Sequence, residues 1–198
     1  PSIFDTDEFW QNILKDPAIT TLEAGFKSDK DRYWPYTYGS HMWDLIRFVV
    51  GDVSSITTQF HRVGAHATWQ SLIGLRGGAV GSADLTCYEH GDGGEGLRVC
   101  GTEGTVTLDL YNPFLWRAAD VAVHTDADRL VHASPVAYVN AYERQLRSFE
   151  AAVDAAAGVG DGDASGEWGV GATPDDGVAT VRLIEAMRAP VHVAHSEI

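Results

Sequence analysis

The residues best placed for chemistry in this sequence are His41 and Asp44, which lie three positions apart. On a helix such a pair shares one face, so the carboxylate can orient the imidazole. Ser40 is a good N-cap, which puts His41 in the first turn of a predicted helix. The positive end of a helix dipole disfavours imidazolium, and a neutral imidazole can act as a base or a hydrogen-bond partner. The alternative is an exposed histidine beside a solvated carboxylate.

Three aromatic residues lie close to this pair in the sequence: Tyr36, Tyr38 and Trp43. Their rings could supply a flat surface on which a sugar or polyol stacks. The alternative is that all three belong to the hydrophobic core. The sequence alone leaves both interpretations open.

The other histidines form no pattern typical of a metal site. His61 and His66 fall in a predicted strand and the loop after it, as expected for surface or sheet histidines. His192 and His195 lie near the C-terminus without a cysteine nearby, so no metal site is predicted. A metal-dependent hydrolase that uses several histidines stays as an alternative. The two cysteines are interpreted as small core residues: Cys87 and Cys100.

Two glycine-rich stretches, residues 77–81 and 91–96, have the composition of phosphate-binding loops. A dinucleotide fingerprint needs a strand before the glycines and a helix that opens at the last one. Here a predicted strand follows each stretch, so both are interpreted as turns. The sequence therefore predicts that this chain binds no nucleotide cofactor.

The spacing of apolar residues predicts the elements that must position these side chains. The predicted helices cover residues 5–17, 40–50, 139–157 and 173–189. The predicted strands cover residues 19–28, 53–63, 67–75, 79–88, 96–99, 105–110, 121–124 and 129–132. Successive antiparallel strands favour one meandering sheet. We expect a single domain, residues 1–198, with a flexible loop at 158–171 and a tail at 191–198. Its expected class is α+β, an open, largely antiparallel sheet with helices packed on one face.

The chain carries 28 acidic and 14 basic side chains, a formal net charge of −14. Nucleic acid and anionic membranes would repel this surface, so neither is expected as a partner. No apolar run is long enough to span a bilayer and no signal peptide is recognised, which predicts a cytoplasmic protein. Only Lys15, Lys27 and Lys30 are lysines and most of the acids are Asp, which we interpret as the mark of a salt-loving source.

Four motifs occur in the order found in one oxidoreductase family. Residues 39–53, which begin Gly39-Ser40-His41-Met42-Trp43-Asp44, resemble the Gly-x-His-x-x-Asp helix of the glucose-fructose oxidoreductase/inositol dehydrogenase (Gfo/Idh/MocA) family. Residues 67–81 look like its strand–glycine turn–strand hairpin, and residues 97–106 look like its second glycine hairpin. Residues 142–157 and 173–189 resemble its closing helices, so the resemblance spans roughly residues 5–190.

The resemblance implies the C-terminal domain of such an enzyme, a fold like that of the C-terminal domain of dihydrodipicolinate reductase. It implies a sugar-like alcohol or carbonyl as substrate, NAD or NADP as cofactor, and a homo-oligomer formed through the open sheet face. The family's Rossmann domain and its Glu-Lys-Pro lysine are not found in this sequence, so the isolated chain is expected to be inactive. The alternative is a stand-alone, non-catalytic dimerisation or binding module of the same fold.

The resemblance also assigns roles to residues. His41 is the catalytic histidine that contacts the substrate hydroxyl, with Asp44 as its neighbour on the helix. Thr37, Tyr38 and Tyr36 are expected to shape the substrate site. Members that oxidise polyols often carry Asp four residues before this histidine, where this chain has Thr37. A threonine hydroxyl can form a hydrogen bond but holds no charge at neutral pH, so the substrate class stays open.

Overall fold

The structure, a computed structural model, describes residues 24–87, 94–111, 119–125, 127, 131–134, 140–158 and 171–189. These residues divide between two compact units. The first unit holds residues 24–47, 51–87 and 180–189. The second holds residues 48–50 and the described residues between 94 and 179. Each unit contains its own antiparallel sheet.

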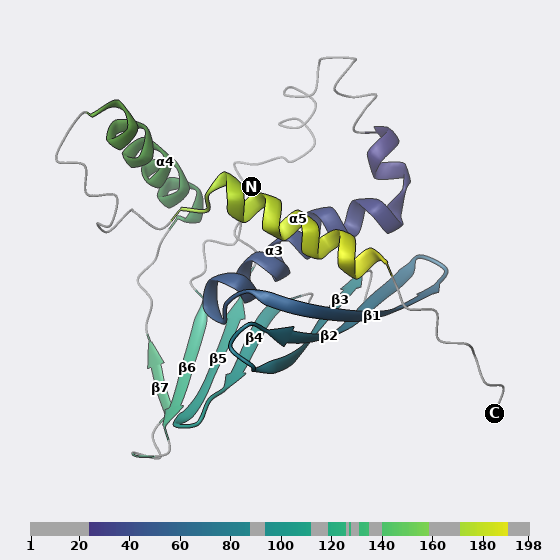
Figure 1. Cartoon of the computed structure of the whole chain (residues 1–198), viewed down its shortest axis with the longest axis horizontal. Coiled ribbons are helices and arrows are strands. Elements are labelled where there is room, and N and C mark those ends of the chain that lie inside the picture. Colours follow the sequence, from purple (N-terminus) through teal and green to yellow (C-terminus); the bar gives the residue numbers. More distant parts are fainter. Residues whose placement is uncertain are drawn as a thin grey trace, which may run out of the picture. The chain divides into compact units, whose positions relative to one another are not determined.

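The first unit contains a three-stranded sheet in the order β1-β2-β3 (Figure 1). Its strands are β1 (Val53–Val63), β2 (His66–Leu75) and β3 (Val80–Cys87), so the predicted boundaries are confirmed to within one residue. The turn between β2 and β3 is also confirmed. Gly78 adopts φ +86°, a conformation that glycine tolerates best, and its N–H donates to the Leu75 carbonyl.

One face of this sheet is buried. Along β2 every second residue is buried, as the period of a strand requires: Ala67, Trp69, Ser71, Ile73 and Leu75. Helices α3 (Lys30–Val49) and α5 (Pro174–Arg188) pack on this face, α5 from Thr180 onward. A Cβ on Gly39 of α3 would lie 3.4 Å from Leu85 Cδ2 and 3.5 Å from Met187 Cε. Helices on one face of an antiparallel sheet confirm the α+β class.

Helix α3 begins ten residues before the helix that the sequence predicted. The Asp29 carboxylate accepts from the Arg32 N–H at 3.2 Å, which caps the helix start. Ser40 is therefore not an N-cap; its hydroxyl donates to the Thr37 carbonyl within the helix at 2.8 Å. Residues 24–28 are also helical, so the strand predicted for 19–28 is wrong over that part. The helix thus also includes Pro35 and the aromatic residues before Ser40, a stretch for which no helix was predicted.

A tertiary contact explains how α3 accommodates Pro35. Proline has no N–H, so the carbonyl four residues earlier, that of Asp31, loses its helical donor. The Arg188 Nε donates to this carbonyl at 3.3 Å. The arginine from α5 thus supplies the missing donor, which makes a helix possible where proline in the sequence argues against one.

The second unit contains a four-stranded antiparallel sheet in the order β4-β5-β6-β7. Its strands are β4 (Glu95–Cys100), β5 (Gly104–Leu110), β6 (Asp120–Thr125) and β7 (Val131–Ser134). The strands predicted at 96–99, 105–110 and 121–124 are confirmed, but the single meandering sheet is wrong, because in the described residues the pairing ends at β3 and begins again at β4. Residue alternation specifies each hairpin and does not specify which hairpins join.

The two remaining helices also begin at side-chain caps, and they lie within one or two residues of the predicted starts at 139 and 173. The Asn140 side chain accepts from the backbone at the start of α4 (Ala141–Ala157). At the start of α5 the Asp176 N–H donates to Thr173 Oγ1 at 3.2 Å, and the Thr173 N–H donates to the Asp176 carboxylate at 2.9 Å. The predicted helix 5–17, most of the loop 158–171 and the tail 191–198 lie outside the described residues.

Candidate functional site

One side of α3 collects three of the predicted site residues. Thr37, His41 and Asp44 follow one another at spacings of four and three, so they share a face. Gly39, Trp43 and Ile46 are buried on the opposite side of the same helix segment. The imidazole of His41 and the carboxylate of Asp44 are exposed, and Thr37 is half-buried. The helix therefore presents an imidazole, a carboxylate and a hydroxyl on its outward side.

The position of His41 along the helix differs from the prediction. Because α3 begins at Lys30, His41 lies well inside the helix and not in its first turn. The field of a helix terminus falls off within the first turn, so the predicted effect of the helix dipole on His41 does not apply. Among the described residues, His41 has no hydrogen-bond or ion-pair partner.

Asp44 contacts α5. Its Oδ1 accepts from the Thr180 hydroxyl at 3.5 Å, a long hydrogen bond that ties the carboxylate to a buried threonine. Sequence reasoning missed Thr180, although its spacing to Ile184 and Met187 marks the buried side of α5. Two other apolar residues near it on α5, Val178 and Val181, are exposed.

The Thr37 hydroxyl is already used as a donor. It donates to the carbonyls of Tyr33 at 2.8 Å and Trp34 at 3.3 Å. Threonine in a helix commonly makes this bond to its own backbone. What remains free is the acceptor capacity of the oxygen, so Thr37 suits a ligand hydroxyl that donates.

The aromatic residues separate into two groups. Tyr38 is 52% exposed and lies three positions before His41, so its ring borders the outward side of α3. Tyr36 is on another side, where its hydroxyl donates to Glu185 Oε1 and its ring packs edge-on against Phe26. Trp43 is completely buried and belongs to the core. Of the predicted stacking surface, the structure keeps only Tyr38 beside His41.

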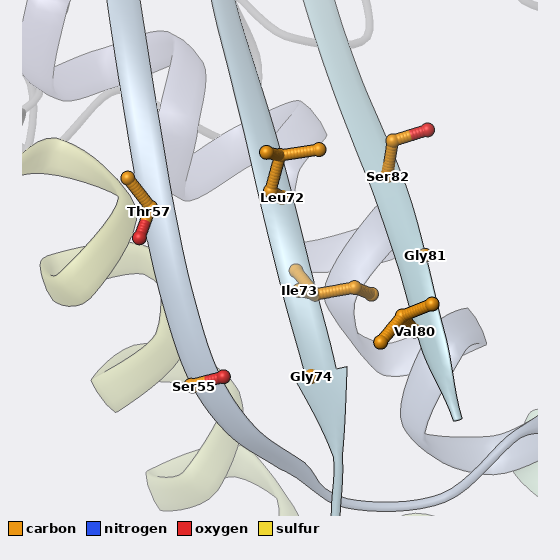
Figure 2. Close-up of a pocket in the computed structure, with 8 residues that line it drawn as sticks. All are labelled: Ser55, Thr57, Leu72, Ile73, Gly74, Val80, Gly81 and Ser82. Carbon is orange, nitrogen blue, oxygen red and sulfur yellow. The ribbon is translucent and has the colours of Figure 1, made fainter. Parts of the chain in front are cut away.

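The exposed face of the first sheet carries a shallow depression of about 530 Å³ (Figure 2). Leu72 is 70% exposed and Val80 is 85% exposed, and both stand above the strands there. The lining consists of hydroxyl, aliphatic and glycine residues without a charged side chain: Ser55, Thr57, Leu72, Ile73, Gly74, Val80, Gly81 and Ser82. A Cβ on Gly74 would lie 2.5 Å from Ser55 Oγ, so the serine hydroxyl lies close against the glycine at the floor of the depression. This chemistry suits apolar contact better than phosphate binding.

No three metal-ligating side chains gather in the part of the chain that the structure describes. His61 and His66 are exposed on the first sheet, as predicted. Cys87 is buried as predicted, whereas Cys100 is exposed, so the core assignment of Cys100 is wrong. Cys100 ends an edge strand, where alternation puts every second side chain in solvent.

No helix among the described residues is both long and apolar enough to cross a membrane. Comparisons with protein-family models, with curated proteins and with solved structures found no match to this chain.

Proposed function

We propose that this chain is the substrate-binding and oligomerisation domain of an NAD(P)-dependent oxidoreductase similar to the Gfo/Idh/MocA family. Its substrate is a sugar-like alcohol or carbonyl, and its location is cytoplasmic, in a salt-rich cell. One observation carries the proposal: Thr37, His41 and Asp44 share the outward side of a helix that packs on an antiparallel sheet. Their side chains match a ligand rich in hydroxyl groups.

Each residue has a distinct role in this proposal. His41 contacts the reacting hydroxyl, because its imidazole has no competing partner among the described residues. Thr37 accepts a hydrogen bond from a neighbouring hydroxyl. The Tyr38 ring lies against the carbon face of the sugar. Asp44, tied to Thr180, accepts from a further hydroxyl.

The nicotinamide cofactor belongs to a separate Rossmann domain in this proposal. The residues described here do not fit a dinucleotide: the Gly77-Gly78 turn joins two strands, and residue 94 leads into β4 rather than into a helix. A pyrophosphate is normally held at a helix N-terminus after such glycines. The chain therefore supplies the substrate side of the site and no step that involves the cofactor.

The oligomer forms through the open face of the β1–β3 sheet. Leu72 and Val80 are exposed there among small neutral residues, the composition expected of a face that another copy covers. Each copy carries a net charge of −14, so two copies repel one another and association strengthens as salt screens that repulsion.

Saturation-transfer NMR with myo-inositol, glucose and glycerol tests the substrate role. We expect millimolar binding to the wild-type chain, loss of that binding in His41→Asn, and retention in His61→Asn. His61 is a matched control because it is an exposed histidine on β1. Equal binding to both variants would contradict the assignment of His41. A fluorescence titration with NADH should show no binding. Tight binding would overturn the proposal that a separate domain binds the cofactor.

A stand-alone dimerisation or binding module of the same fold is the second candidate. The observation that favours it is the apolar open face of β1–β3, which is sufficient for self-association without any chemistry at α3. The source gene separates the two candidates. An upstream reading frame that encodes a strand, Gly-x-Gly-x-x-Gly and a helix supports the enzyme, whereas an isolated start codon supports the module.

A further inference from the structure

Helix α4 exposes a stripe of large apolar side chains. Tyr142, Leu146, Phe149 and Val153 are 45%, 69%, 68% and 49% exposed, and their spacing of four, three and four puts them on one side of the helix. No residue of α4 is buried. Exposed apolar surface of this kind and regularity normally marks a contact with another surface.

The opposite side of α4 faces its own chain. Its half-buried residues are small: Ser148, Ala151 and Ala155. A Cβ on Gly171 would lie 2.7 Å from Ser148 Oγ, so the backbone just before α5 lies close against this side. The helix is thus fixed by its small-residue side, and its large apolar side chains turn away from that contact.

The β4–β7 sheet has an apolar face of matching character. The strand register places Leu97 beside Leu108 and Val121, and Val99 beside Val106 and Val123. Side chains in one such row point to the same face, and both rows share it. None of these six residues is buried, and Val106 is 37% exposed. A sheet needs one face covered by a second layer, and the residues of this unit that the structure describes leave that layer incomplete.

We propose that α4 of one copy packs across the apolar face of the β4–β7 sheet of a second copy, and that the second copy returns the same contact. Each copy carries both the α4 stripe and the sheet face. A two-fold axis between two copies therefore covers both stripes and both sheet faces in one dimer. This interface is separate from the β1–β3 face and does not depend on the proposed enzymatic role.

The available area favours this exchange over a simple pairing of two α4 helices. An aromatic side chain buries roughly 150–250 Å², so a stripe of two aromatic and two aliphatic side chains at these exposures offers on the order of 400 Å². Two paired stripes would bury about 800 Å² in total, the size of a crystal contact, whereas two helix-on-sheet contacts bury about 1,600 Å², the standard size of a specific interface.

Sedimentation equilibrium at high salt measures the association. Leu146→Asp should raise the dimer dissociation constant at least about tenfold. Ala152→Asp is the matched control: it adds the same acid to an exposed position of α4, away from the stripe, and should leave the constant unchanged. Leu72→Asp should also leave this contact intact, which separates it from association through the β1–β3 face. Circular dichroism confirms that each variant is folded. Equal constants for Leu146→Asp and Ala152→Asp would overturn the proposal.

Disulfide trapping identifies what the stripe contacts. All chains carry Cys100→Ser, because Cys100 is exposed whereas Cys87 is buried. A chain with Phe149→Cys is mixed with a chain with Val106→Cys and oxidised gently. The proposal predicts a disulfide-linked heterodimer. Self-linked Phe149→Cys chains would mean that two α4 helices pair, and an internal disulfide in the double variant without any dimer would mean that α4 folds onto its own sheet; either result overturns the proposal.

Discussion

Gly104 offers a sharp test of how β5 and β6 pair. It lies at the start of β5, opposite Thr125 of β6. A Cβ at this position would lie 2.1 Å from the His124 carbonyl oxygen and 3.1 Å from both the His124 carbonyl carbon and the Thr125 Cα. All three are backbone atoms, so no side-chain rotation relieves the overlap. Gly104→Ala therefore forces the two strands apart.

The cost of that movement follows from the size of the overlap. Restoring an ordinary carbon–oxygen contact separates the strands by roughly 1 Å, which takes the neighbouring ladder hydrogen bonds beyond their normal length. Overpacking of this kind costs about 1–3 kcal/mol. We expect Gly104→Ala to lower the free energy of unfolding by about 2–3 kcal/mol, which lowers Tm by roughly 5–10 °C for a chain of this size.

Gly101→Ala is the control for the same substitution in the same hairpin. The nearest atom to its added Cβ is the Gly104 carbonyl oxygen at 3.5 Å, an ordinary contact. Gly101→Ala should raise the free energy of unfolding slightly, by less than about 1 kcal/mol, because alanine makes the unfolded chain less flexible. Urea unfolding followed by circular dichroism at matched salt measures both variants. Equal midpoints for Gly104→Ala and Gly101→Ala would refute the β5–β6 register.

Three further results are expected. Trp43→Phe should lower the free energy of unfolding by about 1 kcal/mol or less, because the buried indole N–H has no acceptor among the described residues. Trp43→Ala should lower it by about 3–5 kcal/mol, because it leaves a cavity in the core. Equal losses for the two variants would contradict the packing of Trp43. Arg188→Met should lower the free energy of unfolding by about 1–2 kcal/mol, because the Asp31 carbonyl loses its donor. The loss should be clearly smaller in a Pro35→Ala background, where the N–H of residue 35 can donate to the same carbonyl. A double-mutant cycle that shows no coupling between the two substitutions would contradict this role of Arg188. Melting curves in KCl should show Tm rising from low to multimolar salt, since each chain carries a net charge of −14, and a flat profile would remove the salt-loving interpretation.

The strands could be predicted from the sequence because their signals are local. Alternation along β2 and the glycines of the 76–78 turn fix the hairpin within a short stretch of chain. The start of α3 could not be predicted in the same way. Pro35 argues against a helix unless Arg188 supplies the donor, and that arginine lies 157 positions from the carbonyl it serves. Long-range contacts of this kind leave no local trace.

The candidate site likewise combines features that local spacing predicts with features that depend on long-range contacts. Spacing alone places Thr37, His41 and Asp44 on one helix side, because that relation depends only on the helical repeat. The contact of Asp44 with Thr180 joins residues 136 positions apart and needs the packed structure. The mistaken position of His41 within the first turn came from the helix start and not from the helix face.

The central claim is that the outward side of α3 binds a sugar-like ligand. Its most direct test is a titration of the ¹⁵N-labelled chain with myo-inositol, followed residue by residue by NMR. The account predicts that the shifts concentrate at Thr37, Tyr38, His41 and Asp44 and disappear in His41→Asn. Shifts confined to other residues, or none at saturating ligand, would contradict it.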